Sequence, residues 1–379
     1  MTQRVAIVAC ANYQAEAVNP AITELLGLVP GWDAPFASSS QVLLKPNLLM
    51  RRLPEEATTT HPEVVRQMAI IMQAMGKSCI LADSPGGSFS ETALRRVYEG
   101  CGLTSLAKEG LLVLNTDVGH REIEFDSGLI LKRMTIAAFA AQGIPLLNIC
   151  KLKTHMMMTF TGAVKNLFGI VPGTLKAEYH FRMPEEDDFA DALIDICLAG
   201  KPQFSVMDAI VAMEGAGPSS GDPRETRLIL ASADPFALDL VATHLIGLAP
   251  GAVPTVRRSI ARGLAPKSVE EIEIVGLGLE QAFIKDFVIP KTKGPSFLGG
   301  RAKRIADAAI RPLPVFDFTT CTGCGVCARH CPAKVIEMRH NRPHLKLSGC
   351  IRCFCCHELC PSKAVVIKRK PLMRLLSKL

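Results

Sequence analysis

The sequence has few aromatic residues and contains no module typical of nucleic-acid-binding proteins. Phe, Trp and Tyr make up 5% of its 379 residues, and there is a single Trp. Proteins that bind single-stranded nucleic acid commonly stack bases on aromatic side chains set among basic ones. This scarcity, together with the missing module, argues against nucleic acid as a partner.

Long apolar runs and an N-terminal leader are also missing. No apolar run reaches the roughly 18 residues that a membrane-spanning helix needs. The first nine residues, MTQRVAIVA, read as the start of a strand and lack the apolar region and cleavage site of a signal peptide. We therefore expect a cytoplasmic protein.

Cysteine, by contrast, is abundant, and eight of the 14 cysteines form two copies of one spacing. Each copy reads C-x2-C-x2-C-x3-C-P, and 18 residues separate the copies. Zinc needs only C-x2-C pairs, and disulfides do not suit the reducing compartment expected here. The spacing therefore predicts iron–sulfur clusters. The two runs are Cys321, Cys324, Cys327 and Cys331 before Pro332, and Cys350, Cys353, Cys356 and Cys360 before Pro361.

The position of the fourth cysteine in each run predicts how the ligands are shared. Three cysteines at i, i+3 and i+6 surround one face of a 4Fe-4S cluster, and in two-cluster proteins the fourth ligates the other cluster. We therefore expect two 4Fe-4S clusters. With these runs, residues 313–370 resemble the bacterial two-cluster ferredoxin module, a small α+β domain. One ligand set is Cys321, Cys324, Cys327 and Cys360, and the other is Cys350, Cys353, Cys356 and Cys331.

Positive charge is concentrated in the same part of the chain. Residues 313–379 carry 12 Lys and Arg against 3 Asp and Glu, while the rest of the chain is nearly neutral. This surplus predicts an acidic redox partner protein or an anionic membrane surface. Residues 371–379 form a short basic amphipathic tail, expected to dock on its own domain or to make a peripheral membrane or partner contact.

The first 290 residues alternate short β-branched runs with amphipathic helical stretches. This rhythm predicts an α/β fold with a mostly parallel sheet and flanking helices. The expected domains are 1–287, a linker at 288–312, the two-cluster domain at 313–370 and the tail at 371–379. Expected strands are 5–9, 42–45, 79–82, 111–115, 145–149, 205–207, 228–231 and 271–275, and expected helices are 62–75, 91–99, 186–198 and 236–246.

Polar residues gather where these strands should end, which is where α/β sheets usually bind ligands. After the strand at 145–149 the chain is expected to enter a loop and then a helix-like stretch that places Thr161 and Lys165 on one face. Together with a methionine-rich wall at 156–158, these residues predict an anion pocket; the alternative is a solvated loop and an exposed helix face. The expected catalytic residues are Lys151, Lys153, Thr154, His155 and Lys165, and the expected ligand-binding residues are Lys45, Asn47, Thr161 and Asn166.

The same stretch resembles the signature of a known family of iron–sulfur proteins. Residues 151–169 are similar to the signature of the domain-of-unknown-function 362 family, whose members often carry a ferredoxin module. Blocks at 45–47, 60–62, 83–86, 207–210, 214–218 and 233–239 resemble other segments of that family. The resemblance spans about residues 4 to 280 and implies a single domain type, but no reaction.

Two functions remain open on the sequence. The first is an oxidoreductase in which the clusters pass electrons to a small anionic substrate over the lysines, with His155 transferring protons. The second is a non-catalytic electron carrier or maturation factor that docks a partner protein. No flavin or nicotinamide motif is present, so we expect another protein to supply the electrons. Three further carboxylates are candidate cation ligands or acid–base groups: Asp208, Glu214 and Asp234.

Overall fold

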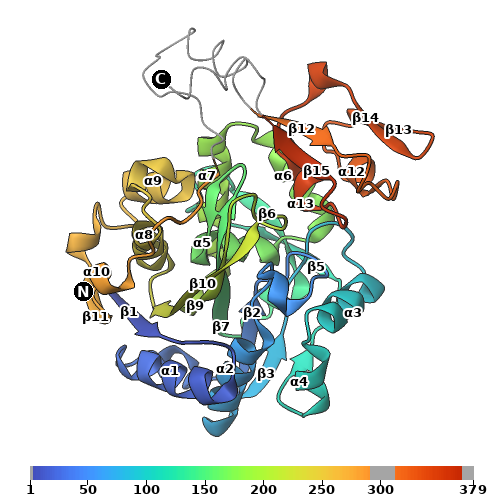
Figure 1. The fold of residues 1–379 in the computed structure, drawn as a ribbon. Coiled ribbons are helices and arrows are strands. Elements are labelled where there is room, and N and C mark those ends of the chain that lie inside the picture. The colour runs from blue at the N-terminus through green and yellow to red at the C-terminus, as the bar shows by residue number, and fades with distance from the viewer. Residues whose placement is uncertain (1–2, 291–311, 369–379) are drawn as a thin grey trace.

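A nine-stranded sheet forms the centre of the large N-terminal part (Figure 1). The computed structural model describes residues 3–290 and 312–368. Along the sheet the order is β11-β1-β10-β9-β7-β2-β3-β4, and β8 pairs with β7. Most pairings are parallel; β10 runs antiparallel to β1 and β9, as does β8 to β7. The strands are β1 Arg4–Ala9, β2 Gln41–Pro46, β3 Ser78–Leu81, β4 Val113–Leu114, β7 Leu146–His155, β8 Thr159–Thr161, β9 Pro202–Glu214, β10 Asp222–Ser232 and β11 Glu273–Gly276.

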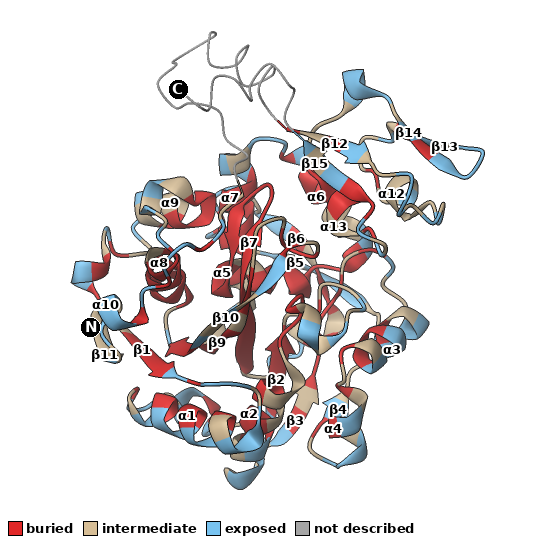
Figure 2. Ribbon diagram, in the orientation of Figure 1, coloured by how far each residue is buried: buried red, intermediate tan, exposed pale blue. Residues whose placement is uncertain are grey.

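Helices cover both faces of this sheet because successive strand side chains point to opposite sides. In β1, Ala6 and Val8 pack with α1 and α2, whereas Val5 and Ile7 pack with α8 and α9. Figure 2 shows the resulting pattern, with buried central strands and exposed outer helix surfaces. One layer holds α1 Ala15–Gly27, α2 Pro62–Ala74, α3 Glu91–Gly100 and α4 Thr104–Lys108; the other holds α5 Ala163–Asn166, α7 Glu186–Gly200, α8 Pro235–Leu245 and α9 Pro254–Ala261.

The predicted fold class is confirmed, and each expected strand and helix has a counterpart. Two local expectations are wrong. β7 continues through His155, so Lys151 and Lys153 lie in a buried strand and not in a loop. Thr161 lies on β8 and Lys165 on α5, so they do not share a helix face. Charged residues inside a strand read as a loop, because sequence patterns do not reveal the partners that allow their burial. The hairpin of β5 (His120–Glu124) and β6 (Arg133–Ala137) was not predicted.

The cysteine-rich part forms a small α+β domain, drawn in red in Figure 1. It consists of two antiparallel strand pairs and two short helices. The predicted tail at 371–379 and most of the predicted linker lie outside the described residues. Val288 exchanges hydrogen bonds with Glu214 and Gly215, so it packs with the large domain. The elements are β12 Leu313–Phe316 with β15 Val365–Lys368, β13 Ile336–Arg339 with β14 Arg342–Leu345, α12 Val326–Arg329 and α13 Cys355–Glu358.

The small domain is held against the large one through α13 and the residue before it. Phe354 is 7% exposed and packs into the core around α5 and α7. His357 Nε2 lies 3.0 Å from the Ala216 carbonyl, and the Ser219 hydroxyl donates to the Glu358 carbonyl at 2.6 Å. Arg52 donates to the carbonyls of Cys360 and Pro361. The second cysteine run is therefore fixed to the large domain.

Membrane crossing finds no support in the fold. Within residues 3–290 and 312–368, none of the helices combines the length and apolar character that a bilayer span requires. The expected location in the cytoplasm stays a prediction.

The docking role of Phe354 predicts a specific loss on truncation. Phe354→Ala should destabilise the protein by about 3–5 kcal/mol, because it leaves a cavity in the large-domain core. We expect a lower midpoint in denaturant and faster proteolysis between the domains. Phe318→Ala is the matched control, since that ring is 47% exposed and should matter little. Equal stabilities for the two variants would contradict the docking role.

Candidate functional site

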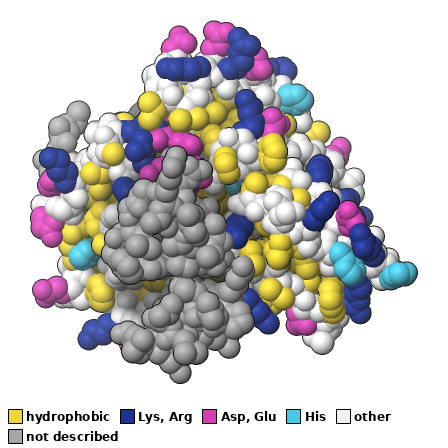
Figure 3. All heavy atoms as spheres, turned by 90° about the horizontal axis from the view of Figure 1, so that it is seen from above, with side chains coloured by type: hydrophobic (Ala, Val, Ile, Leu, Met, Phe, Trp, Pro, Cys, Tyr) yellow, Lys and Arg dark blue, Asp and Glu magenta, His cyan; other side chains and the backbone are white. Residues whose placement is uncertain are grey.

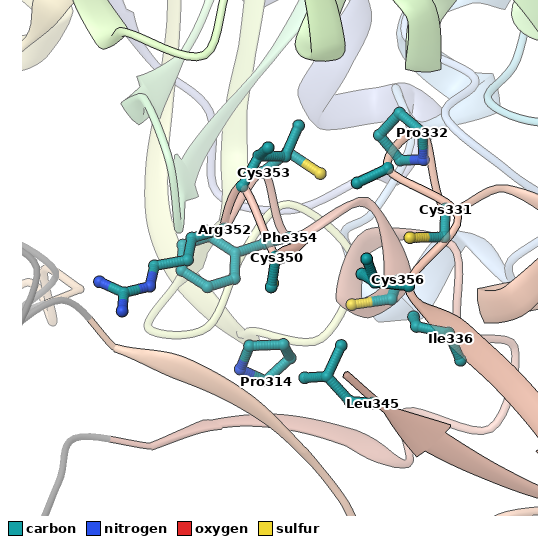
Figure 4. Close-up of a pocket in the computed structure, with 13 residues that line it drawn as sticks. Pro314, Cys331, Pro332, Ile336, Leu345, Cys350, Arg352, Cys353, Phe354 and Cys356 are labelled. Carbon is teal, nitrogen blue, oxygen red and sulfur yellow. The ribbon is translucent and has the colours of Figure 1, made fainter. Parts of the chain in front are cut away.

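The eight motif cysteines surround two hollows within the small domain. One hollow, of about 330 Å³, is lined by Cys331, Cys350, Cys353 and Cys356, and Figure 4 shows the sulfur atoms of Cys331 and Cys356 turned toward it. The other, of about 310 Å³, is lined by Cys321, Cys324, Cys327 and Cys360. The fourth cysteine of each run thus joins the first three of the other run, in the predicted grouping. All eight are free thiols.

This donor set fits iron–sulfur clusters better than single metal ions. Four thiols around a hollow are the ligands of a 4Fe-4S cluster. In the described ranges, by contrast, no three His, Cys, Asp or Glu side chains come close enough to hold one ion. Asp208, Glu214 and Asp234 have other partners: Lys151, the Val288 amide and the start of α8. The hypothesis that these three carboxylates bind a cation is therefore wrong.

The two runs share one backbone conformation, although their sequences differ. Gly323 and Gly325 have φ near +70° in the first run. Arg352 and Phe354 take the matching positions in the second run, with φ of 58° and 61°. A left-handed backbone is unfavourable for a bulky residue, so other contacts must hold it. The burial of Phe354 in the large-domain core provides such a contact.

Loss of one ligand from each set tests the assignment. Anaerobic analysis should find about eight irons and as much sulfide per chain. Cys324→Ala and Cys353→Ala should each remove about half of that content and change the EPR spectrum of the dithionite-reduced protein. Cys355→Ala is the matched control, because this thiol lies outside the repeated spacing. Detection of only zinc would refute the clusters.

Two of the predicted pocket lysines are neutralised by buried carboxylates. Lys45 Nζ lies 2.8 Å from Asp83 Oδ1, and Lys151 Nζ lies 2.8 Å from Asp208 Oδ2. Lys151 also donates to the Tyr13 hydroxyl, which in turn donates to Asp208. These pairs tie together the ends of neighbouring strands. Neither lysine retains free charge for a ligand.

Three further lysines, Lys153, Lys165 and Lys176, form no ion pair with a carboxylate among the described residues. Lys153 donates to the Asn47 side chain and the Thr58 carbonyl, both at 2.6 Å. Lys176, from α6 (Gly173–Arg182), donates to the Ser84 carbonyl, and it lies near the Phe168 ring, as does Lys165. Burial lowers the pKa of all three, to about 7 for Lys153 and about 8 for Lys176.

Glu358 brings the carboxylate of α13 toward these lysines. Its charge opposes the lowering of the pKa at Lys153, Lys165 and Lys176. Glu358 Oε2 also lies 3.6 Å from His155 Nε2. The lysine site (Lys153, Lys165, Lys176, His155 and Glu358) therefore combines residues of both domains. Asp83 of the large domain, already paired with Lys45, also opposes the lowering of the pKa at Lys176 and Lys153.

Two buried histidines leave ring nitrogens without partners at this site. His155 Nδ1 accepts from the amides of Met157 and Met158, so a neutral ring carries its proton on Nε2. In the described structure, neither His155 Nε2 nor His180 Nδ1 has a hydrogen-bond partner. Burial, reinforced by the charge of Lys165, lowers the pKa of both rings, to about 3 for His180. Buried polar groups are normally satisfied, so these two nitrogens are candidates for a hydrogen bond to a bound molecule.

The remaining predicted residues have positioning roles or lie aside. Asn47 donates to Asn166, which donates to the Lys45 carbonyl and to Asn148. This chain orients the amide that receives Lys153. Thr154 does not belong to this chain, because its hydroxyl donates to the Gly215 carbonyl. Thr161 lies opposite Lys153 in the backbone pairing of β7 with β8. Sequence reasoning missed Lys176, His180 and Glu358, because no motif contains them and only the fold brings them together.

The free energy of unfolding should respond differently to the loss of a paired lysine and to the loss of an unpaired one. Lys151→Met leaves Asp208 buried without its counter-ion and should cost about 3–5 kcal/mol. Lys165→Met removes a desolvated ammonium without a partner, so the free energy of unfolding should stay within about 0.5 kcal/mol of wild type or rise. Denaturant unfolding of both variants measures the difference. A large loss in Lys165→Met would show that its charge is structural.

Comparisons with known proteins match both parts of the chain. The domain of unknown function DUF362 matches residues 42–244, and a 4Fe-4S dicluster domain matches residues 313–361. The "Thylakoid-associated protein sll1697" of Synechocystis sp. is 34% identical over 272 residues, which cover 71% of this chain and 83% of that protein. Among solved structures, the lactate racemase apoprotein from Thermoanaerobacterium thermosaccharolyticum aligns with a TM-score of 0.40 and 11% identity, over 66% of this chain and 58% of that one. The dicluster match supports an iron–sulfur electron-transfer role for the C-terminal part.

Proposed function

This chain belongs to the DUF362 family and carries an iron–sulfur domain, and on that basis we propose that it is an oxidoreductase that reduces a small anionic substrate. Electrons would pass through two 4Fe-4S clusters to a ligand held at the lysine site. The observation that carries this proposal is a group of three desolvated lysines that form no ion pair with a carboxylate among the described residues: Lys153 is buried, and Lys165 and Lys176 are half-buried. They lie near Glu358 of α13, the helix that also bears Cys356.

The energetics favour a ligand at these lysines. An unpaired ammonium in a buried position is unfavourable, which is why burial lowers the pKa of each. The fold pairs Lys45 with Asp83 and Lys151 with Asp208. The three remaining ammonium groups are opposed only by Glu358 and by Asp83, which is already paired, among the described residues. A carboxylate or phosphate would supply the missing negative charge. Proteins retain such unfavourable arrangements chiefly at functional sites.

The residues of the site have distinct tasks in this proposal. Lys165 and Lys176 bind the anion as mobile point charges, and the Asn47 amide holds Lys153 in place. His155 donates Nε2–H to the ligand, with Nδ1 fixed by two backbone amides. Met156, Met157 and Phe168 are nearly buried and exclude water, which strengthens each of these interactions. Bound 4Fe-4S clusters would supply single electrons.

The position of α13 connects the two functions. This helix contains Cys356, which lines one cysteine hollow, and Glu358, which faces the lysines. A cluster in that hollow would lie directly behind the ligand. The large and small domains would then form one redox site rather than two independent units.

Anion binding should depend on pH with a defined sign. An anion binds the ammonium form, so affinity should be constant below pH 7, where Lys153 and Lys176 are both protonated. Above about pH 7 to 8 each must take up a proton on binding, and affinity should fall by up to roughly tenfold per pH unit for each lysine. Isothermal titration with oxalate, whose charge is constant across this range, measures the pH dependence. Inorganic phosphate, which itself loses a proton in this range, is compared with oxalate at one fixed pH to distinguish the two anion classes.

A pair of variants completes the test. Lys165→Met should weaken binding of the favoured anion at least roughly tenfold at pH 7, while cluster absorbance stays unchanged. Lys108→Met, on an exposed surface of α4, is the control and should bind as wild type. Wild-type affinity in Lys165→Met, with no pH dependence, would reject the anion site and favour a non-catalytic electron carrier.

A further inference from the structure

The two cysteine hollows differ in their exposure to solvent. In the hollow farther from the lysine site, Cys324 is exposed and both Cys321 and Cys327 are partly exposed. In the other, Cys331, Cys353 and Cys356 are buried and Cys350 is partly exposed, whereas Cys360 is the one buried member of the first set. The buried set adjoins Phe354, which packs into the large domain. We call the set of Cys321, Cys324, Cys327 and Cys360 the outer cysteine set.

Cationic and aromatic side chains surround the exposed side of the outer cysteine set. The Arg342 guanidinium lies 5.4 Å from the Phe318 ring and donates to the Phe318 carbonyl at 2.7 Å. It also reaches the Cys321 carbonyl at 3.4 Å. The Arg329 guanidinium lies beside Gly325, only 3.1 Å from where a Cβ would stand. Phe318 is 47% exposed, so its ring is open to a partner beside the arginines.

The charge around this face is positive on balance. Residues 317–346 contain five Lys or Arg and two acidic residues. Both acids are engaged: Asp317 accepts hydrogen bonds from Thr319, and Glu337 pairs with Arg339. Figure 3 shows Lys, Arg and His side chains gathered at the end of the molecule where β13 and β14 lie. An exposed aromatic ring among arginines is the composition of a protein-binding surface.

From these observations we propose that an acidic one-electron donor protein docks on Phe318, Arg329 and Arg342 and delivers electrons at the outer cysteine set. One electron passes from the reduced donor to a cluster held there; the donor is oxidised by one electron, and no bond or proton changes place. Charge complementarity selects the donor, because positive potential attracts an acidic surface. The docking proposal depends on this surface alone. Only the later transfer of electrons to a substrate rests on the proposed function.

A charge-reversal pair tests the surface in the cluster-loaded protein. The probe is a reduced plant-type [2Fe-2S] ferredoxin, an acidic one-electron donor, mixed in stopped flow without added anion. Arg329→Glu/Arg342→Glu should slow cluster reduction roughly tenfold at low ionic strength, and added salt should erase the difference. Arg95→Glu reverses an exposed charge on α3 and should react as wild type.

Two further measurements distinguish a loss of donor docking from damage to the clusters. Titration with oxidised ferredoxin should show weaker binding to the double variant and unchanged binding to Arg95→Glu. Reduction by methyl viologen radical cation should be as fast as in wild type or faster, with iron content unchanged. Wild-type ferredoxin affinity and rate in the double variant would overturn the proposal. Because neither phosphate nor a carboxylate ligand is added, failure of the lysine site leaves this result unaffected.

Discussion

Burial of positive charge is the constraint on which the large domain depends. Five lysines lie at or near the carboxyl ends of the central strands, in surroundings that penalise an ammonium group. Asp83 and Asp208 neutralise two of them, Lys45 and Lys151. Networks of this kind join distant segments, as when Asp208 accepts hydrogen bonds from Tyr13 and the His61 amide. These contacts hold in place the strands on or near which the unpaired lysines lie.

The small domain completes the site as well as supplying the cysteines. Phe354 anchors the second cysteine run in the large-domain core, and the turn that follows delivers Glu358 to the lysines. The left-handed backbone at Phe354 is tolerated because its ring is held from several sides. Separation of the domains would expose apolar surface and leave the lysine charges without that carboxylate. The two domains are therefore coupled by packing.

The two ends of the small domain differ in chemistry. Toward the large domain, Cys331, Cys353 and Cys356 are buried, on the side of the small domain that faces the charged lysine site. Away from it, Cys324 is exposed among arginines and an aromatic ring. In the proposed function, this asymmetry would give electron flow a direction, because a donor protein would approach the exposed end. Water exclusion at the other end would favour transfer to a bound molecule rather than to solvent.

The sequence by itself determined the features that depend on local spacing. Two runs of C-x2-C-x2-C-x3-C predicted the grouping of cysteines around two hollows, and the alternation of apolar stretches predicted the α/β sheet. Charge pairing depends on contacts between residues far apart in the chain, such as Lys151 with Asp208 and His155 with Glu358. Only the tertiary structure decided which lysines are neutralised, and it added Lys176 to the site. The physical reason is that the desolvation and Coulomb energies of a side chain are set by its neighbours in space.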